Sequence, residues 1–267
     1  MSALQTKHIA VIGAGNIGRI LLSRLLAAQV PAANLVVCDS DPGRADAVAE
    51  HFGVRLISLS EGTTCNADIL LIATPPKTVI EILRELSNQL HAGQLVVSFA
   101  AAIPLERLEA ALPNDVCLVR VMPNTASLVG QGMNPVVFGS LVTPEAREIV
   151  EELLMTLGEA IEVRDEQMNW CVGLSGAAMR SLLPALEGMT QAGIEAGLSM
   201  EDARRVAAQV MLGTAALALQ TELSFDEIKS LTPMQTVDEA AVAATHLEAA
   251  REAKEKIDQA QRRIEGR

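Results

Sequence analysis

The feature that most constrains the fold is an alternation of short apolar runs with amphipathic segments over the first 157 residues. The apolar runs have the length of strands and are apolar on both faces, which is typical of a parallel sheet covered by helices on both sides. The strand-like runs fall at residues 8–13, 34–39, 68–73, 95–101, 116–122 and 134–139, and the helix-like segments at 16–29, 42–52, 76–89, 104–111 and 143–157. The alternation predicts an α/β first half.

The second half of the chain has a different periodicity. From about Asp165 the strand signals cease, and long Ala- and Leu-rich segments carry apolar residues at three- and four-residue spacing. Ser199 followed by Glu201 and Asp202 predicts a helix start. We therefore predict two domains, 1–163 and 164–263, the second being all-α and used for dimerisation. Residues 264–267, Ile-Glu-Gly-Arg, resemble a protease recognition sequence left from an expression tag, and they are set aside.

Composition narrows the class of protein. The chain of 267 residues has a formal net charge of −12, only 2% aromatic residues and no Tyr, which disfavours a nucleic-acid partner. No segment reaches ~18 uninterrupted apolar residues, so no membrane partner is expected. The four Cys form no C-x-x-C pair, and Cys38 and Cys117 lie in strand-like runs. Reduced, buried thiols and a cytoplasmic location are the expectation.

A glycine pattern follows the first strand-like run. Gly13, Gly15 and Gly18 have the spacing G-x-G-x-x-G, between that run and a helix that begins near Asn16 and Ile17. Such glycines permit a tight turn, close approach of a pyrophosphate and close packing of helix on strand. The helix N-terminus would face the phosphates with free N–H groups. These five residues therefore predict a dinucleotide site in a doubly wound, Rossmann-type sheet, with a purely structural glycine turn as the alternative.

Acidic residues at the end of the second strand bear on the choice of cofactor. Asp39 lies about 20 residues after Gly18, where a carboxylate accepts hydrogen bonds from the adenosine ribose. Asp39 and Asp41 would repel a 2′-phosphate, and Arg44 is the nearby counterweight. We expect NADH or NADPH as cofactor, with NADH slightly favoured. The alternative is that Asp39 to Asp41 only cap the helix that begins at Pro42.

The stretch from Arg120 to Met133, RVMPNTASLVGQGM, ends an apolar run by presenting a proline, an asparagine and a threonine together. With GAGNIG (13–18), IATPP (72–76) and VVSFAAAI (96–103), it resembles the pyrroline-5-carboxylate reductase family over residues 8 to about 163. The resemblance continues at LSG (174–176) and AAQVMLGTA (207–215).

The resemblance implies reduction of a cyclic imine carboxylate by NAD(P)H, the last step of proline synthesis, in a homodimer or higher homo-oligomer. A protonated imine already attracts hydride, so alignment of donor and acceptor would supply most of the rate and no metal is needed. The four His show no metal-ligand spacing. The resemblance adds cofactor contacts at Ala73, Thr74, Pro75, Ala100 and Asn124, and catalytic roles for Asn124, Ser175 and Thr236.

The chain departs from the family in the helical half. The family has Ser-Pro-Gly-Gly-Thr-Thr where this chain has Thr-Pro-Met-Gln-Thr-Val (232–237), and only Thr236 of the threonine pair is kept. Met and Gln cannot adopt φ > 0 as cheaply as glycine, so the backbone cradle for the substrate should differ in shape. We expect the substrate to contact Thr232, Gln235, Thr236 and Arg180. Arg180 would grip the substrate carboxylate, or else pair with Glu187 or across a dimer.

Three functions are compatible with these features. The chain is a pyrroline-5-carboxylate reductase, a divergent relative that reduces another imine or a carbonyl, or a non-catalytic dinucleotide-binding regulatory protein. The intact MPNT and glycine motifs disfavour the third.

Overall fold

The computed structural model describes residues 2–59, 66–232 and 234–266, so Cys65 and Pro233 lie outside the described residues. The chain divides into two compact units, each considered by itself. The first comprises Met1–Gly176 together with Glu252–Arg267, and the second comprises Ala177–Arg251.

The first unit is built on a sheet with the strand order β3-β2-β1-β4-β5-β6-β7-β8. The inner strands β1, β2, β4, β5 and β6 run parallel, and every one of their residues is buried. The strands are β1 (Ile9–Ile12), β2 (Leu35–Cys38), β3 (Arg55–Leu56), β4 (Ile69–Ile72), β5 (Leu95–Ser98), β6 (Cys117–Val121), β7 (Gly132–Phe138) and β8 (Gly158–Glu162). The predicted α/β fold class is confirmed.

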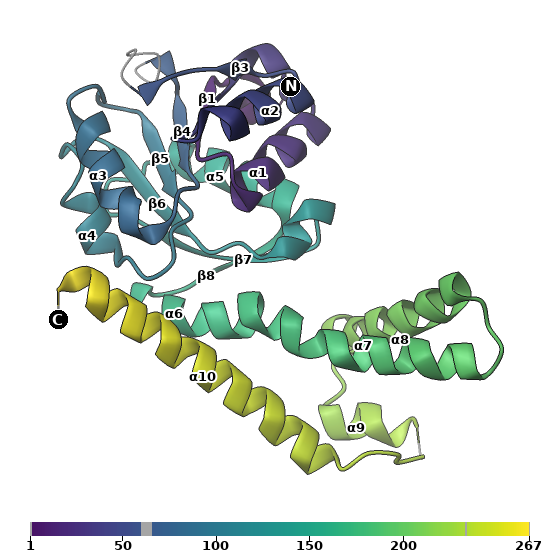
Figure 1. Ribbon diagram of the computed structural model, residues 1–267. Coiled ribbons are helices and arrows are strands. Elements are labelled where there is room, and N and C mark those ends of the chain that lie inside the picture. The colour runs from purple at the N-terminus through teal and green to yellow at the C-terminus, as the bar shows by residue number, and fades with distance from the viewer. Residues whose placement is uncertain (1, 60–65, 233, 267) are drawn as a thin grey trace. The chain divides into compact units, whose positions relative to one another are not determined.

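Helices cover both faces of this sheet (Figure 1). One apolar cluster joins the sheet to α1 (Asn16–Ala27), α2 (Pro42–Phe52) and α5 (Pro144–Leu157). A second cluster joins the other face to α3 (Pro76–Ser87) and α4 (Leu105–Glu109). Each fully buried Val, Leu or Ile contributes roughly 1.5–3 kcal/mol, so the two clusters stabilise the sheet from both sides. Short 3₁₀ segments η1 (Ala3–Thr6), η2 (Ala32–Asn34) and η5 (Thr125–Val129) complete this part of the chain.

The sheet differs from the predicted parallel sheet at one end. β7 runs antiparallel to β6, because the connection through η5 is shorter than the dozen or more residues that a parallel crossover needs. β8 then pairs with β7 in parallel. The sequence did not predict β3 or β8. Both are short and largely exposed edge strands, and they lack the apolar run that marks the inner strands.

The first unit continues past the predicted domain boundary at residue 163. The segments η6 (Asp165–Gln167), α6 (Met168–Cys171) and the π-helical η7 (Val172–Ala177) follow β8. Met168 and Cys171 are buried against Val137 of the sheet. The Asn169 side-chain amide donates to Asp258 Oδ1 (3.0 Å) and Gln261 Oε1 (2.8 Å). These contacts place the start of the helical half, and the end of the last helix, in the first unit.

The last helix, α10 (Glu239–Glu265), includes Ile264 and Glu265 of the segment 264–267 that was predicted to be a tag remnant. Ile264 is partly buried and packs against the apolar cluster on the α3 face of the sheet. The origin of residues 264–267 stays a prediction, but Ile264 takes part in the packing of the first unit.

The second unit is all-α. It consists of α7 (Ala178–Glu195), α8 (Met200–Gln220), α9 (Phe225–Ser230) and the first part of α10. The Ser199 hydroxyl accepts a hydrogen bond from the Asp202 amide (3.1 Å), which confirms the predicted helix start. Few side chains of this unit are buried, and many leucines on its helices are exposed. No described helix is both long enough and apolar enough to cross a membrane.

Candidate functional site

The glycine turn lies between β1 and α1. Gly13 has φ 108°, and its amide donates to the Cys38 carbonyl (2.7 Å). A Cβ atom at Gly13 would lie 2.6 Å from the Ala73 carbonyl oxygen, and one at Gly18 would overlap the Gly13 carbonyl. Neither position therefore tolerates a side chain, and the turn is held tightly between β1, β4 and α1.

Gly15 is the exception among the three glycines. A Cβ atom there would meet nothing within 4 Å. Gly15 is also the N-cap of α1, and no side chain caps this helix end. The first N–H groups of a helix lack partners within the helix, and they attract anions together with the helix dipole. Open space over an uncapped helix N-terminus fits a diphosphate, and Asn16 and Ile17 form the first helical positions there.

The Asp39 carboxylate interacts with several neighbouring groups. It accepts hydrogen bonds from the amides of Ala14 (2.7 Å) and Asp41 (2.9 Å). It also accepts hydrogen bonds from Arg44 Nε (3.1 Å) and Nη2 (2.8 Å). Burial raises the pKa of Asp39, but the hydrogen bonds from Arg44, Asp41 and Ala14 outweigh burial and hold the pKa below its ordinary value. Asp39 therefore ties the glycine turn to the end of β2, and Arg44 offsets its charge.

The neighbouring strand ends contribute three further groups. Thr74 follows β4, and its hydroxyl is buried without a partner among the described residues. Pro75 is the N-cap of α3 and offers no side-chain cap. Ala100 follows β5, is 2% exposed, and donates its amide to Ser98 Oγ (3.4 Å). Ala102 in the same loop has φ 61°, a left-handed conformation that costs a non-glycine residue energy and that clusters at functional sites.

The Pro-Asn-Thr stretch that follows β6 begins the 3₁₀ segment η5. Asn124 is the N-cap of η5, and its Oδ1 accepts from the Ala126 amide (3.2 Å). Its Nδ2 donates to the Ser175 carbonyl (3.3 Å). Ser175 is 6% exposed, and its hydroxyl donates to the Cys171 carbonyl within its own helical segment (2.7 Å). Two of the three predicted catalytic residues, Asn124 and Ser175, are thus brought together, but through a backbone carbonyl and not through their reactive atoms.

The residues predicted to bind the substrate belong to the second unit. Arg180 is exposed in the first turn of α7, and neither Glu187 nor any other acid within the described ranges forms an ion pair with it. Thr232, Gln235 and Thr236 are exposed in the connection between α9 and α10. The Gln235 side chain donates to the Val237 carbonyl (3.4 Å).

The sequence missed a buried ion pair below the carboxyl edge of the sheet. Arg120, in the inner strand β6, is 2% exposed, and its Nη1 lies 2.6 Å from Asp165 Oδ1. Burial lowers the pKa of Arg120 below its ordinary value, and the Asp165 carboxylate opposes this effect. A charged residue inside an otherwise apolar strand was the available signal, because such a side chain needs a partner.

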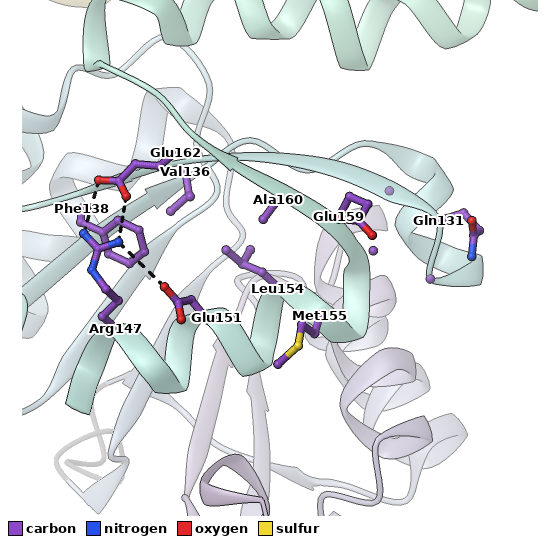
Figure 2. A pocket seen from close by; sticks show the side chains of 13 residues that line it. Gln131, Val136, Phe138, Arg147, Glu151, Leu154, Met155, Glu159, Ala160 and Glu162 are labelled. Atoms are coloured by element: carbon purple, nitrogen blue, oxygen red, sulfur yellow. Dashed lines mark hydrogen bonds and ion pairs between the residues drawn. The ribbon is translucent and has the colours of Figure 1, made fainter. Parts of the chain in front are cut away.

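A cavity of about 600 Å³ lies elsewhere, at the β8 edge of the sheet next to α5 (Figure 2). None of the described residues that line it belongs to the predicted cofactor set. Arg147, the cation among the described lining residues, is bound to Glu162 (Nη1 to Oε2, 2.8 Å) and lies over the Phe138 ring at 3.7 Å. Since these groups satisfy one another, the cavity is a weaker candidate for chemistry than the glycine turn and the β6 end.

Comparisons with known proteins match both halves of the chain. Residues 8–102 match the family described as NADP oxidoreductase coenzyme F420-dependent, and residues 165–265 match pyrroline-5-carboxylate reductase dimerisation. The pyrroline-5-carboxylate reductase of Escherichia coli K12 is 33% identical over 80% of each chain. That of Mycobacterium tuberculosis H37Rv is 34% identical over 80% of this chain and 74% of the relative.

Solved structures share the whole fold. Pyrroline carboxylate reductase of Plasmodium falciparum with NADP bound superposes with a TM-score of 0.83 at 19% identity, covering 96% of this chain and 99% of the other. A pyrroline-5-carboxylate reductase from Coxiella burnetii gives a TM-score of 0.79 at 24% identity, over 95% and 98% of the two chains.

Proposed function

This chain belongs to the pyrroline-5-carboxylate reductase family, and on that premise we propose that it reduces the C=N bond of pyrroline-5-carboxylate with NADH or NADPH. The reaction moves a hydride from the reduced nicotinamide to the imine carbon, and the ring nitrogen keeps its proton. The protein's task is to align the two partners and exclude water, which contributes roughly 7–11 kcal/mol in well-oriented reactions. The observation that carries the proposal is the joint placement of the uncapped α1 N-terminus and the Asn124–Ser175 contact at carboxyl ends of strands in one sheet.

The residues around the glycine turn fit a dinucleotide. The open space at Gly15 and the free N–H groups of Asn16 and Ile17 would hold the diphosphate. The unpartnered Thr74 hydroxyl and the backbone at Ala73, Pro75 and Ala100 would border the nicotinamide half. Because both ends of the Asn124 amide are already engaged, we propose that Asn124 shapes this end of the site and does not move a proton.

For the choice between NADH and NADPH, the Asp39–Arg44 pair supports use of both. Two carboxylates, Asp39 and Asp41, favour the ribose diol of NADH, whereas Arg44 can turn from Asp39 toward a 2′-phosphate. We expect Arg44→Ala to weaken NADPH binding about tenfold, the effect of losing one charge-assisted contact. NADH binding should change by less than threefold. Fluorescence titration with both cofactors measures this, and equal losses would remove Arg44 from the recognition of the phosphate.

The substrate carboxylate is proposed to bind Arg180, with Thr232, Gln235 and Thr236 around the ring. The support is chemical: Arg180 is an exposed cation without an ion-pair partner among the described acids. Arg180→Ala should raise the substrate KM at least tenfold and leave cofactor affinity unchanged. An unchanged KM would assign Arg180 to another role.

The helices of the second unit support assembly with a second copy. Leu182, Leu183, Leu212 and Leu219 are 47%, 50%, 60% and 85% exposed in the single chain. Exposed apolar surface of this extent marks a protein interface, and the match to a dimerisation family indicates the partner. We propose a homodimer. The cytoplasmic location stays a prediction.

One assay tests the proposed activity. Oxidation of NADH and NADPH is followed with pyrroline-5-carboxylate and with a panel of other cyclic imines. Turnover highest with pyrroline-5-carboxylate is expected. Higher turnover with another imine would identify a divergent reductase, and cofactor binding without turnover on any imine would contradict the proposal.

A further inference from the structure

The ion pair between Arg120 and Asp165 joins three segments that each lead to the candidate site. Arg120 lies in β6, which leads to Asn124 four residues later. Asp165 begins η6, the start of the helical stretch that carries Ser175. Asp165 Oδ2 also accepts the Leu105 amide (3.0 Å), and Leu105 begins α4 directly after the loop that contains Ala100 and Ala102.

The pair is poorly suited to stabilising the fold alone. Arg120 Nε and Nη2 are buried and have no hydrogen-bond partner among the described residues. Burying a cation with unsatisfied N–H groups is unfavourable, and well-packed apolar residues are often as stable as a buried ion pair. β6 could therefore carry an apolar residue at position 120, as it does at Leu118 and Val119, without loss of packing.

An apolar residue at position 120 could not orient the Asp165 carboxylate. The guanidinium orients the Asp165 carboxylate, which also accepts the Leu105 amide, and Asp165 is itself the first residue of η6. Ten residues further on, the Ser175 carbonyl meets Asn124 Nδ2 at 3.3 Å. A shift of the helical stretch relative to β6 would lengthen that contact.

We propose that Arg120 and Asp165 form a positioning pair that sets the helical stretch Asp165–Gly176, and with it the Asn124–Ser175 contact, against the carboxyl edge of the sheet. The catalytic consequence rests on the proposed reductase function, whereas the structural consequence does not. Neither residue touches cofactor or substrate in this proposal.

The structural consequence is tested by hydrogen–deuterium exchange on the full-length protein. Asp165→Asn keeps the size of the side chain and an acceptor for the Leu105 amide, but it removes the charge that orients Arg120. Amides of Val172–Gly176 and Thr125–Val129 should exchange at least tenfold faster. The control is Glu162→Gln, which breaks the Arg147–Glu162 pair at the β8 edge and should leave both segments unchanged.

The catalytic consequence is tested by steady-state kinetics with pyrroline-5-carboxylate. Asp165→Asn should lower kcat about 10- to 100-fold, as expected for a small misplacement of the reacting groups. The Kd for the cofactor should stay within twofold, because Asp39 and the glycine turn are untouched. In an Asn124→Ala background, Asp165→Asn should lower kcat less than threefold, because the contact through which the pair acts is already absent.

A second variant separates positioning from stability. Arg120→Met combined with Asp165→Asn removes both charges, and we expect it to fold with a Tm close to that of the parent chain while showing the same loss in kcat. The proposal is overturned if exchange in Val172–Gly176 is unchanged in a folded variant. It is also overturned if the losses from Asn124→Ala and Asp165→Asn multiply. Should the parent chain reduce no imine, the exchange result alone decides the proposal, while the reductase function fails separately.

Discussion

The two compact units of this chain bury their apolar residues to very different degrees. In the first unit the inner strands are buried along their whole length, and helices from both faces complete two apolar clusters. In the second unit Ala203, Ala207 and Ala250 are the buried apolar residues among those described, and α7 buries none. The first unit buries most of its own apolar surface, whereas the second presents helices whose apolar faces are exposed in the single chain. A family match to dimerisation over residues 165–265 agrees with that difference.

The largest expected effect concerns the exposed face of α8. Leu212 and Leu219 are seven residues apart and lie on one side of the helix. Changing both to Glu should weaken the proposed dimer at least 100-fold, because burying an unpaired carboxylate costs several kcal/mol. Sedimentation velocity over a range of concentrations measures the association.

The matched control is Met155→Glu, a similarly exposed residue on α5 of the first unit. It should leave the dimer intact. If the α8 variant still dimerises with unchanged affinity, the contrast between the units has another cause.

Within the first unit, the glycine turn offers a comparison between Gly13, where an added Cβ atom would clash, and Gly15, where it would not. Gly13→Val should destabilise the protein by about 2–4 kcal/mol, because a left-handed residue would also press on the Ala73 carbonyl. Gly15→Val should cost less than about 1 kcal/mol of stability, since nothing lies within 4 Å. Gly15→Val should nevertheless weaken cofactor binding at least tenfold. Denaturant unfolding and cofactor titration check the pair, and retained binding by Gly15→Val would contradict the diphosphate site.

A smaller effect is expected from pH. The pKa of Asp39 is lowered in the folded protein, so its contribution to stability is present at neutral pH and is lost as pH falls below the ordinary value of 3.8. Comparison with Asp39→Asn should show that the parent loses more stability between pH 6 and pH 3, by about 1 kcal/mol or less. Urea unfolding at several pH values measures the difference. Parallel curves for the two proteins would show that the hydrogen bonds to Asp39 contribute nothing.

The smallest effect lies in the loop after β5. Ala102 holds a left-handed backbone conformation that glycine adopts without strain. Ala102→Gly should raise stability by up to about 1 kcal/mol, since relief of strain exceeds the added entropy of the unfolded chain. Thermal unfolding checks the sign. A lower Tm would show that packing of the buried Ala102 methyl outweighs the strain.

Much of the first unit could be predicted from local pattern. Most residues of the fully buried strands are apolar, and α1 and α2 begin at the predicted residues Asn16 and Pro42. Edge strand β8 could not be predicted, because two of the five residues in its sequence Gly-Glu-Ala-Ile-Glu are charged and its pairing comes from the backbone of β7. The reversed direction of β7 depends on the length of a connection, and not on a property of the strand itself.

The candidate site divides in the same way. The glycine spacing, Asp39 and the Met-Pro-Asn-Thr end of β6 could be identified in the sequence because each is a short pattern with its own physical meaning. The hydrogen-bond partners of these residues could not be identified in the sequence. That Asp39 accepts a hydrogen bond from the Ala14 amide, and that Asn124 donates to the carbonyl of Ser175, depends on contacts between residues distant in the chain.

By itself, the sequence determined the fold class, the place of the dinucleotide turn and the family, because these follow from periodicity and from residues whose backbone preferences act locally. Only the tertiary structure decided that Arg120 and Asp165 are joined, that the first compact unit includes residues up to Gly176 and from Glu252 onward, and that the second unit leaves its leucines exposed. Burial and pairing are properties of segments brought together by folding, and no single stretch of the chain encodes them.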